Sequence, residues 1–184
     1  KSGRPVQLIL SHSASQNHDH PSGGALARML GLPGEGGITA AWKMEIASAG
    51  GFGTALSALA GKTPPEHLGK ADLSGAEPAY AIPNVAVNSI MVEVPFEAGY
   101  MRGSPQREMI FFIESFIDEL ARAAGIEPVA FRMAMLGGNP RLAACLQAAS
   151  SAGGWDGGGS GSTLGIAACS AFGSHIGLFA DASV

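Results

Sequence analysis

The feature that most constrains this sequence is the stretch 97–125, where a short glycine-containing loop runs into a long amphipathic segment. Apolar side chains recur at three- and four-residue steps, the period of a helix that buries one face. They are Met109, Ile113, Phe116, Ile117, Leu120 and Ala124. Charged side chains fall mostly on the other side. Ser104 is predicted as the N-cap, Pro105 as the first helical residue and Gly125 as the C-terminal stop.

Arg102 lies in the loop directly before this predicted helix. The first N–H groups of a helix lack internal partners, and its dipole is positive at that end. An arginine there adds a fixed cation and a fork of donors, so the loop suits an anionic or oxyanionic ligand. The alternative is an arginine that is solvated or paired for structural reasons, and no motif decides between the two.

Composition narrows the function classes. The 184 residues suffice for one domain with a core, and the charged content of 14% with a net charge of −4 indicates neither nucleic-acid nor polybasic membrane binding. Cys145 and Cys169 are the two cysteines, with no Cys-x-x-Cys, which excludes a cysteine-ligated iron–sulfur cluster or four-cysteine zinc site. No apolar run approaches the ~20 residues of a membrane span.

The first half of the chain predicts short strands separated by turns. Residues 6–10 read as a strand, 11–24 as a polar loop, 25–32 as strand or helix, 33–37 as a turn and 38–47 as the second strand of a hairpin. His18, Asp19 and His20 could be offered as a metal site, but without a third ligand at a telling spacing we favour a solvated loop.

The second half predicts strands and then helices. Residues 80–83 and 85–94 have strand character, the latter covered on both faces. After Gly125, one helix opens at Pro128 and another follows the N-cap Asn139 over 141–152. Residues 153–163 are predicted as a flexible Gly/Ser loop, and 164–172 and 175–184 as paired strands. This grouping favours an α+β fold with a mixed or antiparallel sheet and three consecutive helices.

From Met101 onward, the chain resembles the molybdenum-binding large subunit of the xanthine dehydrogenase and aldehyde oxidoreductase family, above all the isoquinoline 1-oxidoreductase beta-subunit group. The resemblance covers most of the chain and is weakest over 48–77. It is carried by Lys1-Ser2-Gly3-Arg4-Pro5-Val6, Arg102-Gly103, Ile113-Glu114-Ser115-Phe116-Ile117-Asp118-Glu119-Leu120-Ala121, Ala124-Gly125, Pro128-Val129, Phe131-Arg132, Asn139-Pro140-Arg141-Leu142 and Phe172-Gly173-Ser174.

This resemblance implies a molybdenum-cofactor-binding-domain-like fold and an oxidoreductase. Such enzymes hydroxylate N-heterocycles or oxidise aldehydes with water as oxygen source, using molybdopterin, often as its cytosine dinucleotide. An iron–sulfur subunit or domain carries the electrons away. By the same resemblance, Arg102 and Gly103 would contact the cofactor, and Tyr100, Met101 and Ser104 would line the substrate pocket.

The chain also departs from the family. Ser104 stands where xanthine-type members have a phenylalanine, and neither the pterin loop nor the Gly-x-Gly-Glu motif of the catalytic base is found. We therefore expect residues 1–184 to be a single domain, an internal fragment of a larger subunit, inactive and without cofactor by itself. Glu114, in mid-helix, is expected to be structural. The alternatives are a non-catalytic scaffold or interaction domain and an independent anion-binding domain.

Overall fold

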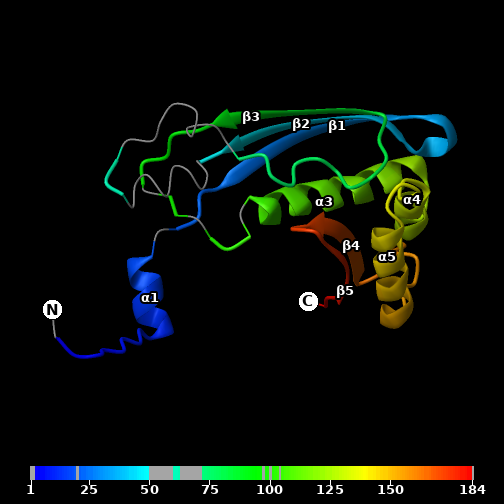
Figure 1. The fold of residues 1–184 in the computed structure, drawn as a ribbon. Coiled ribbons are helices and arrows are strands. Elements are labelled where there is room, and N and C mark those ends of the chain that lie inside the picture. Colours follow the sequence, from blue (N-terminus) through cyan, green and yellow to red (C-terminus); the bar gives the residue numbers. More distant parts are fainter. Residues whose placement is uncertain are drawn as a thin grey trace.

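The computed structural model describes residues 3–19, 21–49, 60–62, 72–96, 98–99, 101–103 and 105–183. Its body is layered, with helix α3 lying between a three-stranded sheet and a two-stranded hairpin (Figure 1). Helices α4 and α5 gather at one end of α3, whereas α1 stands apart from these layers. The elements are α1 (His12–His18), β1 (Ala25–Pro33), β2 (Thr39–Ser48), β3 (Asn84–Met91), α3 (Gln106–Ala124), α4 (Pro128–Ala134), α5 (Pro140–Gly153), β4 (Leu164–Ala171) and β5 (Ser174–Asp181).

The three-stranded sheet has the order β1-β2-β3. Strands β1 and β2 form the antiparallel hairpin predicted for this region, joined by a short 3-10 turn at Glu35–Gly37. Strand β3 pairs in parallel with β2, which makes the sheet mixed. The ambiguous stretch 25–32 is thus a strand, and the α+β class is confirmed.

One face of this sheet packs on α3. Trp42 meets Phe116 edge to face, with ring centroids 5.0 Å apart, and a Cβ added at Gly31 would lie 2.7 Å from the Leu120 side chain. The buried core between the elements consists of Trp42, Met44, Ile46, Ala76, Tyr80, Ile82, Met109, Ile113, Ile117, Ala121, Phe131, Met135, Leu136, Leu142, Leu146, Ile166 and Ala168. The apolar face predicted for α3 therefore packs against the core, as expected from its helical period.

The helix ends follow local capping chemistry. Helix α3 begins one residue later than predicted, because Pro105 is its N-cap and makes no side-chain capping bond; Ser104 lies outside the described residues. Gly125 is the C-cap with φ +67°, the left-handed conformation that glycine adopts without strain. Asn139 caps α5 as predicted, its side chain accepting from the Leu142 N–H at 3.3 Å.

Two predictions at the N-terminus are wrong. Residues 6–10 are extended and exposed but form no strand, because no strand lies beside them within the described residues to complete the backbone hydrogen bonds. Part of the predicted loop 11–24 is helix α1, whose start is capped by Ser11: its Oγ accepts from the Ala14 N–H at 3.2 Å. His20 lies outside the described residues, so the His-Asp-His hypothesis is untested.

The stretch before β3 also differs from expectation. Residues 80–83 form no strand, because their backbone turns toward the end of α4, where the Ala81 N–H donates to the Met135 carbonyl at 2.8 Å. Strand β3 is covered on one face only: Val87 packs against the core, whereas Ile90 on the other face is 64% exposed. Apolar content on both faces of a strand therefore did not mean burial on both faces.

The C-terminal hairpin is confirmed, with β4 and β5 paired antiparallel. It packs closely on α5, since a Cβ added at Gly177 would lie 2.4 Å from the Cys145 carbonyl oxygen. Between α5 and β4, the glycine-rich segment makes local bonds, such as Asp156 Oδ1 accepting from the Ser162 hydroxyl at 3.0 Å. No helix within the described ranges is long and apolar enough to cross a membrane.

Candidate functional site

The loop that carries Arg102 is held between two parts of the chain. On one side, the Gly99 N–H donates to the Pro21 carbonyl at 2.8 Å, and Ser22 forms a parallel bridge with Gly99. On the other side, the Gly103 carbonyl accepts from the Arg107 N–H at 2.8 Å, which joins the loop to the first turn of α3. The loop is therefore anchored at both ends beside a helix start.

Arg102 is exposed. Within the described part of the chain, it makes no hydrogen bond or ion pair. Gly103 has φ +89°, and a Cβ placed on it would meet nothing within 4 Å. The site thus offers a free guanidinium, with five donors and a permanent charge, beside open space at the positive end of a 19-residue helix. This donor set suits an anionic ligand.

Met101 is the one predicted substrate-pocket residue that the structure describes. Met101 is 53% exposed, and its sulfur receives a hydrogen bond from Arg107. Tyr100 and Ser104 lie outside the described residues. The structure therefore places Met101, Arg102 and Gly103 together before α3.

Arg107 was missed by sequence reasoning. Its guanidinium contacts Met101, Glu108 and the Ser22 hydroxyl, the last at 3.4 Å. The one available signal was an arginine in the first turn of the helix, and that position alone does not distinguish it from other exposed helical arginines.

A second polar cluster lies inside the protein. Glu114 accepts from the Tyr80 hydroxyl at 2.8 Å, from Arg132 Nε at 3.0 Å and from the Ala168 N–H at 2.9 Å. Arg132 is fully buried, and its other nitrogens bond Asp118 Oδ1 at 2.6 Å and the Glu114 carbonyl at 3.1 Å. The carboxylate therefore links α3 to α4, to β4 and to the segment before β3.

Burial and neighbouring charges shift the pKa values in this cluster. It raises the pKa of Glu114 above its usual value, against the pull of Arg132 and of the hydrogen bonds from Ala168 and Tyr80. Burial and the Glu114 charge likewise raise the pKa of Tyr80. For Arg132, burial acts to lower the pKa, but Glu114, Tyr80 and Asp118 together raise it. Since every oxygen of Glu114 is committed to these partners, the structural role expected for it fits its surroundings better than acid–base catalysis does.

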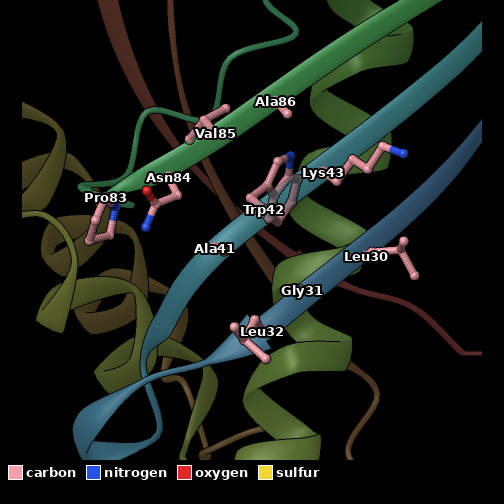
Figure 2. Close-up of a pocket in the computed structure, with 10 residues that line it drawn as sticks. All are labelled: Leu30, Gly31, Leu32, Ala41, Trp42, Lys43, Pro83, Asn84, Val85 and Ala86. Atoms are coloured by element: carbon pink, nitrogen blue, oxygen red, sulfur yellow. The ribbon is translucent and has the colours of Figure 1, made fainter.

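Two cavities are lined by residues outside the loop 98–103. A groove of about 680 Å³ follows the outer face of the three-stranded sheet, where Leu30, Leu32, Lys43 and Asn84 line it (Figure 2). The ammonium of Lys43 is paired with Glu45 at 2.7 Å. A second cavity of about 590 Å³ lies along β3 and the segment 73–78. Neither offers a set of groups for catalysis, and among the described residues no three His, Cys, Asp or Glu gather to hold a metal.

Comparisons with known proteins agree with the resemblance seen in the motifs. The sequence model of the molybdopterin cofactor-binding domain matches residues 1–136, more than half of the chain. Isoquinoline 1-oxidoreductase subunit beta of Brevundimonas diminuta is 30% identical over 112 residues, which cover 58% of this chain and 14% of that subunit. The chain thus spans about one seventh of the length of this relative. The match includes the Arg102 loop, α3 and α4. The chain therefore belongs to the molybdopterin cofactor-binding domain family.

Proposed function

We propose that the loop 98–103 is one wall of the molybdopterin pocket in a larger molybdenum-dependent oxidoreductase subunit. Arg102 and Gly103 contact the cofactor, and Tyr100, Met101 and Ser104 line the adjoining substrate pocket. The observation that carries this proposal is the exposed Arg102 guanidinium, without a partner among the described residues, beside the open face of Gly103.

The residues of the loop fit such a cofactor. Molybdopterin carries a phosphate, often extended to a cytosine dinucleotide diphosphate, and therefore presents anionic oxygens to its binding site. Arg102 meets these oxygens with a charge-assisted fork of donors, and Gly103 leaves room where any other residue would project a Cβ. The nearby carboxylate of Glu108 is held by Arg107, which reduces its repulsion of an anion.

The reaction that we propose for the parent protein is hydroxylation of an N-heterocycle or oxidation of an aldehyde. When bound, the cofactor supplies the two-electron redox chemistry, water supplies the oxygen atom, and the electrons pass to an iron–sulfur partner. The relative is named as a beta subunit, which supports the presence of a partner subunit. In this proposal, the described residues of this chain bind the cofactor and orient it.

The chain by itself is proposed to be inactive. A base that activates the water nucleophile must reach the reacting atoms, and the buried carboxylate of α3 is committed to Arg132, Tyr80 and Ala168. The base and the remaining pocket walls would come from other parts of the parent subunit.

The test is an Arg102→Ala substitution in the parent subunit, with molybdenum content and turnover measured together. We expect both to fall at least ten-fold, since the loss of a charge-assisted bond to an anion is worth about 1.5–3 kcal/mol. Arg122→Ala, at an exposed arginine in the last turn of α3, is the matched control. Unchanged metal content and turnover in the Arg102 variant would remove this loop from the site.

A further inference from the structure

The side chain of Arg107 spans the two anchors of the Arg102 loop. It leaves the first turn of α3 and reaches Met101, the residue immediately before Arg102. The same guanidinium reaches the Ser22 hydroxyl at 3.4 Å, while Glu108 pairs with it from the helix. One cation therefore connects the helix, the loop and the segment that precedes β1.

Ser22, at one end of the bridge made by Arg107, is itself held in place. Ser22 forms the bridge with Gly99, at the other end of the loop. Its neighbour Gly23 lies so close to the end of β2 that an added Cβ would be 2.8 Å from the Ala49 Cβ. The segment carrying Ser22 is thus packed on the sheet, and Arg107 joins it to a helix packed on the same sheet.

The start of α3, from which Arg107 extends, is also held in place. Gly75, with φ +82°, packs so tightly on the first residue of α3 that an added Cβ would lie 2.7 Å from the Gln106 side chain. The helix start therefore cannot shift freely, and a side chain rooted there provides a fixed point. In the loop between these two contacts, a Cβ added at Gly103 would meet nothing within 4 Å.

We propose that Arg107 is a positioning residue for the Arg102 loop: it holds Met101 and Ser22 together, so that the Arg102 guanidinium is presented in one place. The effect of Arg107 on cofactor binding rests on the proposed function, whereas its contacts with Met101 and Ser22 do not. Preorganisation of this kind matters because a binding group that is ordered before the ligand arrives loses less conformational freedom on binding.

The test begins with amide hydrogen exchange in this chain, which needs no cofactor. Arg107→Met keeps the length and helix preference of the side chain but removes its donors and charge. We expect the Gly99 amide, which donates to the Pro21 carbonyl, to exchange about five-fold faster, the factor for one net hydrogen bond. Arg122→Met, at an exposed arginine of the same helix, should leave that rate unchanged. Equal Gly99 rates in the two variants would overturn the proposal.

Two further variants separate positioning from general stability. Arg107→Lys retains the cation but not the fork and should restore part of the protection of Gly99 at an unchanged melting temperature. Ser22→Ala removes the other end of the bridge without touching α3, so it tests the proposal even if Arg107→Met fails to fold. Unchanged Gly99 exchange in Ser22→Ala would then refute the bridge.

Molybdenum content of the parent subunit provides the second readout. If Arg107 positions the cofactor loop, Arg107→Met should lower the metal content several-fold and Arg107→Lys should restore part of it. Faster exchange at Gly99 with unchanged metal content would support the bridge but refute the proposed role of the loop in binding the cofactor. The failure of one proposal is therefore distinguishable from the failure of the other.

Discussion

Replacing the buried Glu114 with alanine is expected to destabilise the protein more than truncating any exposed side chain of α3. The substitution removes the acceptor for three buried donors: the Tyr80 hydroxyl, Arg132 Nε and the Ala168 N–H. Arg132 would remain fully buried, with Asp118, whose side chain is 27% exposed, as its one remaining carboxylate partner.

The magnitude follows from that geometry. Removing one member of a buried ion pair costs about 3–5 kcal/mol, because the remaining charge stays desolvated. We expect a loss of about 4 kcal/mol, a large part of the 5–15 kcal/mol by which domains are stable. With a urea slope of about 2 kcal/mol per molar, the unfolding midpoint should fall by about 2 M. The assay is urea unfolding followed by circular dichroism.

Two controls make the result interpretable. Glu119→Ala removes an exposed carboxylate from the same helix and should change the free energy of unfolding by less than about 0.5 kcal/mol. Adding Arg132→Met to Glu114→Ala removes the stranded charge, so the double variant should be less destabilised than the sum of the singles by about 2 kcal/mol. A Glu114→Ala loss below about 1 kcal/mol, or additive singles, would refute the view of this cluster as a coupled buried unit.

Two further predictions address the same packing. Burial raises the pKa of Glu114 in the folded state, so the folded state binds a proton at Glu114 more tightly than the unfolded chain does. This proton binding adds to the free energy of unfolding. The added stability is fully present below the unfolded pKa of 4.5 and is lost as pH rises through the folded pKa. The stability advantage of wild type over Glu114→Gln should therefore grow from pH 7 to pH 5 in urea unfolding, and a shrinking advantage would contradict the raised pKa. Gly177→Ala should lower the melting temperature by about 5 °C or more, because its Cβ would press on the α5 backbone at Cys145, whereas Gly165→Ala, which meets nothing within 4 Å, is the control that should not.

Several elements could be predicted because their information is local. The 3.6-residue period of α3, the glycine at Gly125, the Asn139-Pro140 start of α5 and the turn at 33–37 each act within a few residues of the chain. Their geometry depends on backbone conformation and on caps that neighbouring residues supply. The start of α1 is encoded locally too, because Ser11 is a typical N-cap residue, although the segment 11–24 was predicted to be a loop.

The strand predictions failed where a partner was needed. Residues 6–10 and 80–83 have strand composition, yet a strand exists only when another strand accepts its hydrogen bonds. For β3, alternation correctly indicated a strand, but which face is buried depended on which side of the sheet the core lies. Composition describes how well a segment suits a sheet and does not say what lies next to it.

For this protein, the sequence by itself determined the α+β class, the end of α3 at Gly125, the start of α5 at Asn139 and, through its motifs, the family and the candidate residue Arg102. Only the tertiary structure decided that Glu114 is shared by Tyr80, Arg132 and Ala168, and that Arg107 reaches Ser22. The physical reason is distance along the chain: these partners lie 18 to 85 residues apart, and their meeting depends on how helices and sheets pack. No local spacing or propensity encodes these contacts. The sequence therefore did not reveal that Glu114 connects elements of the core or that Arg107 connects the loop to Ser22.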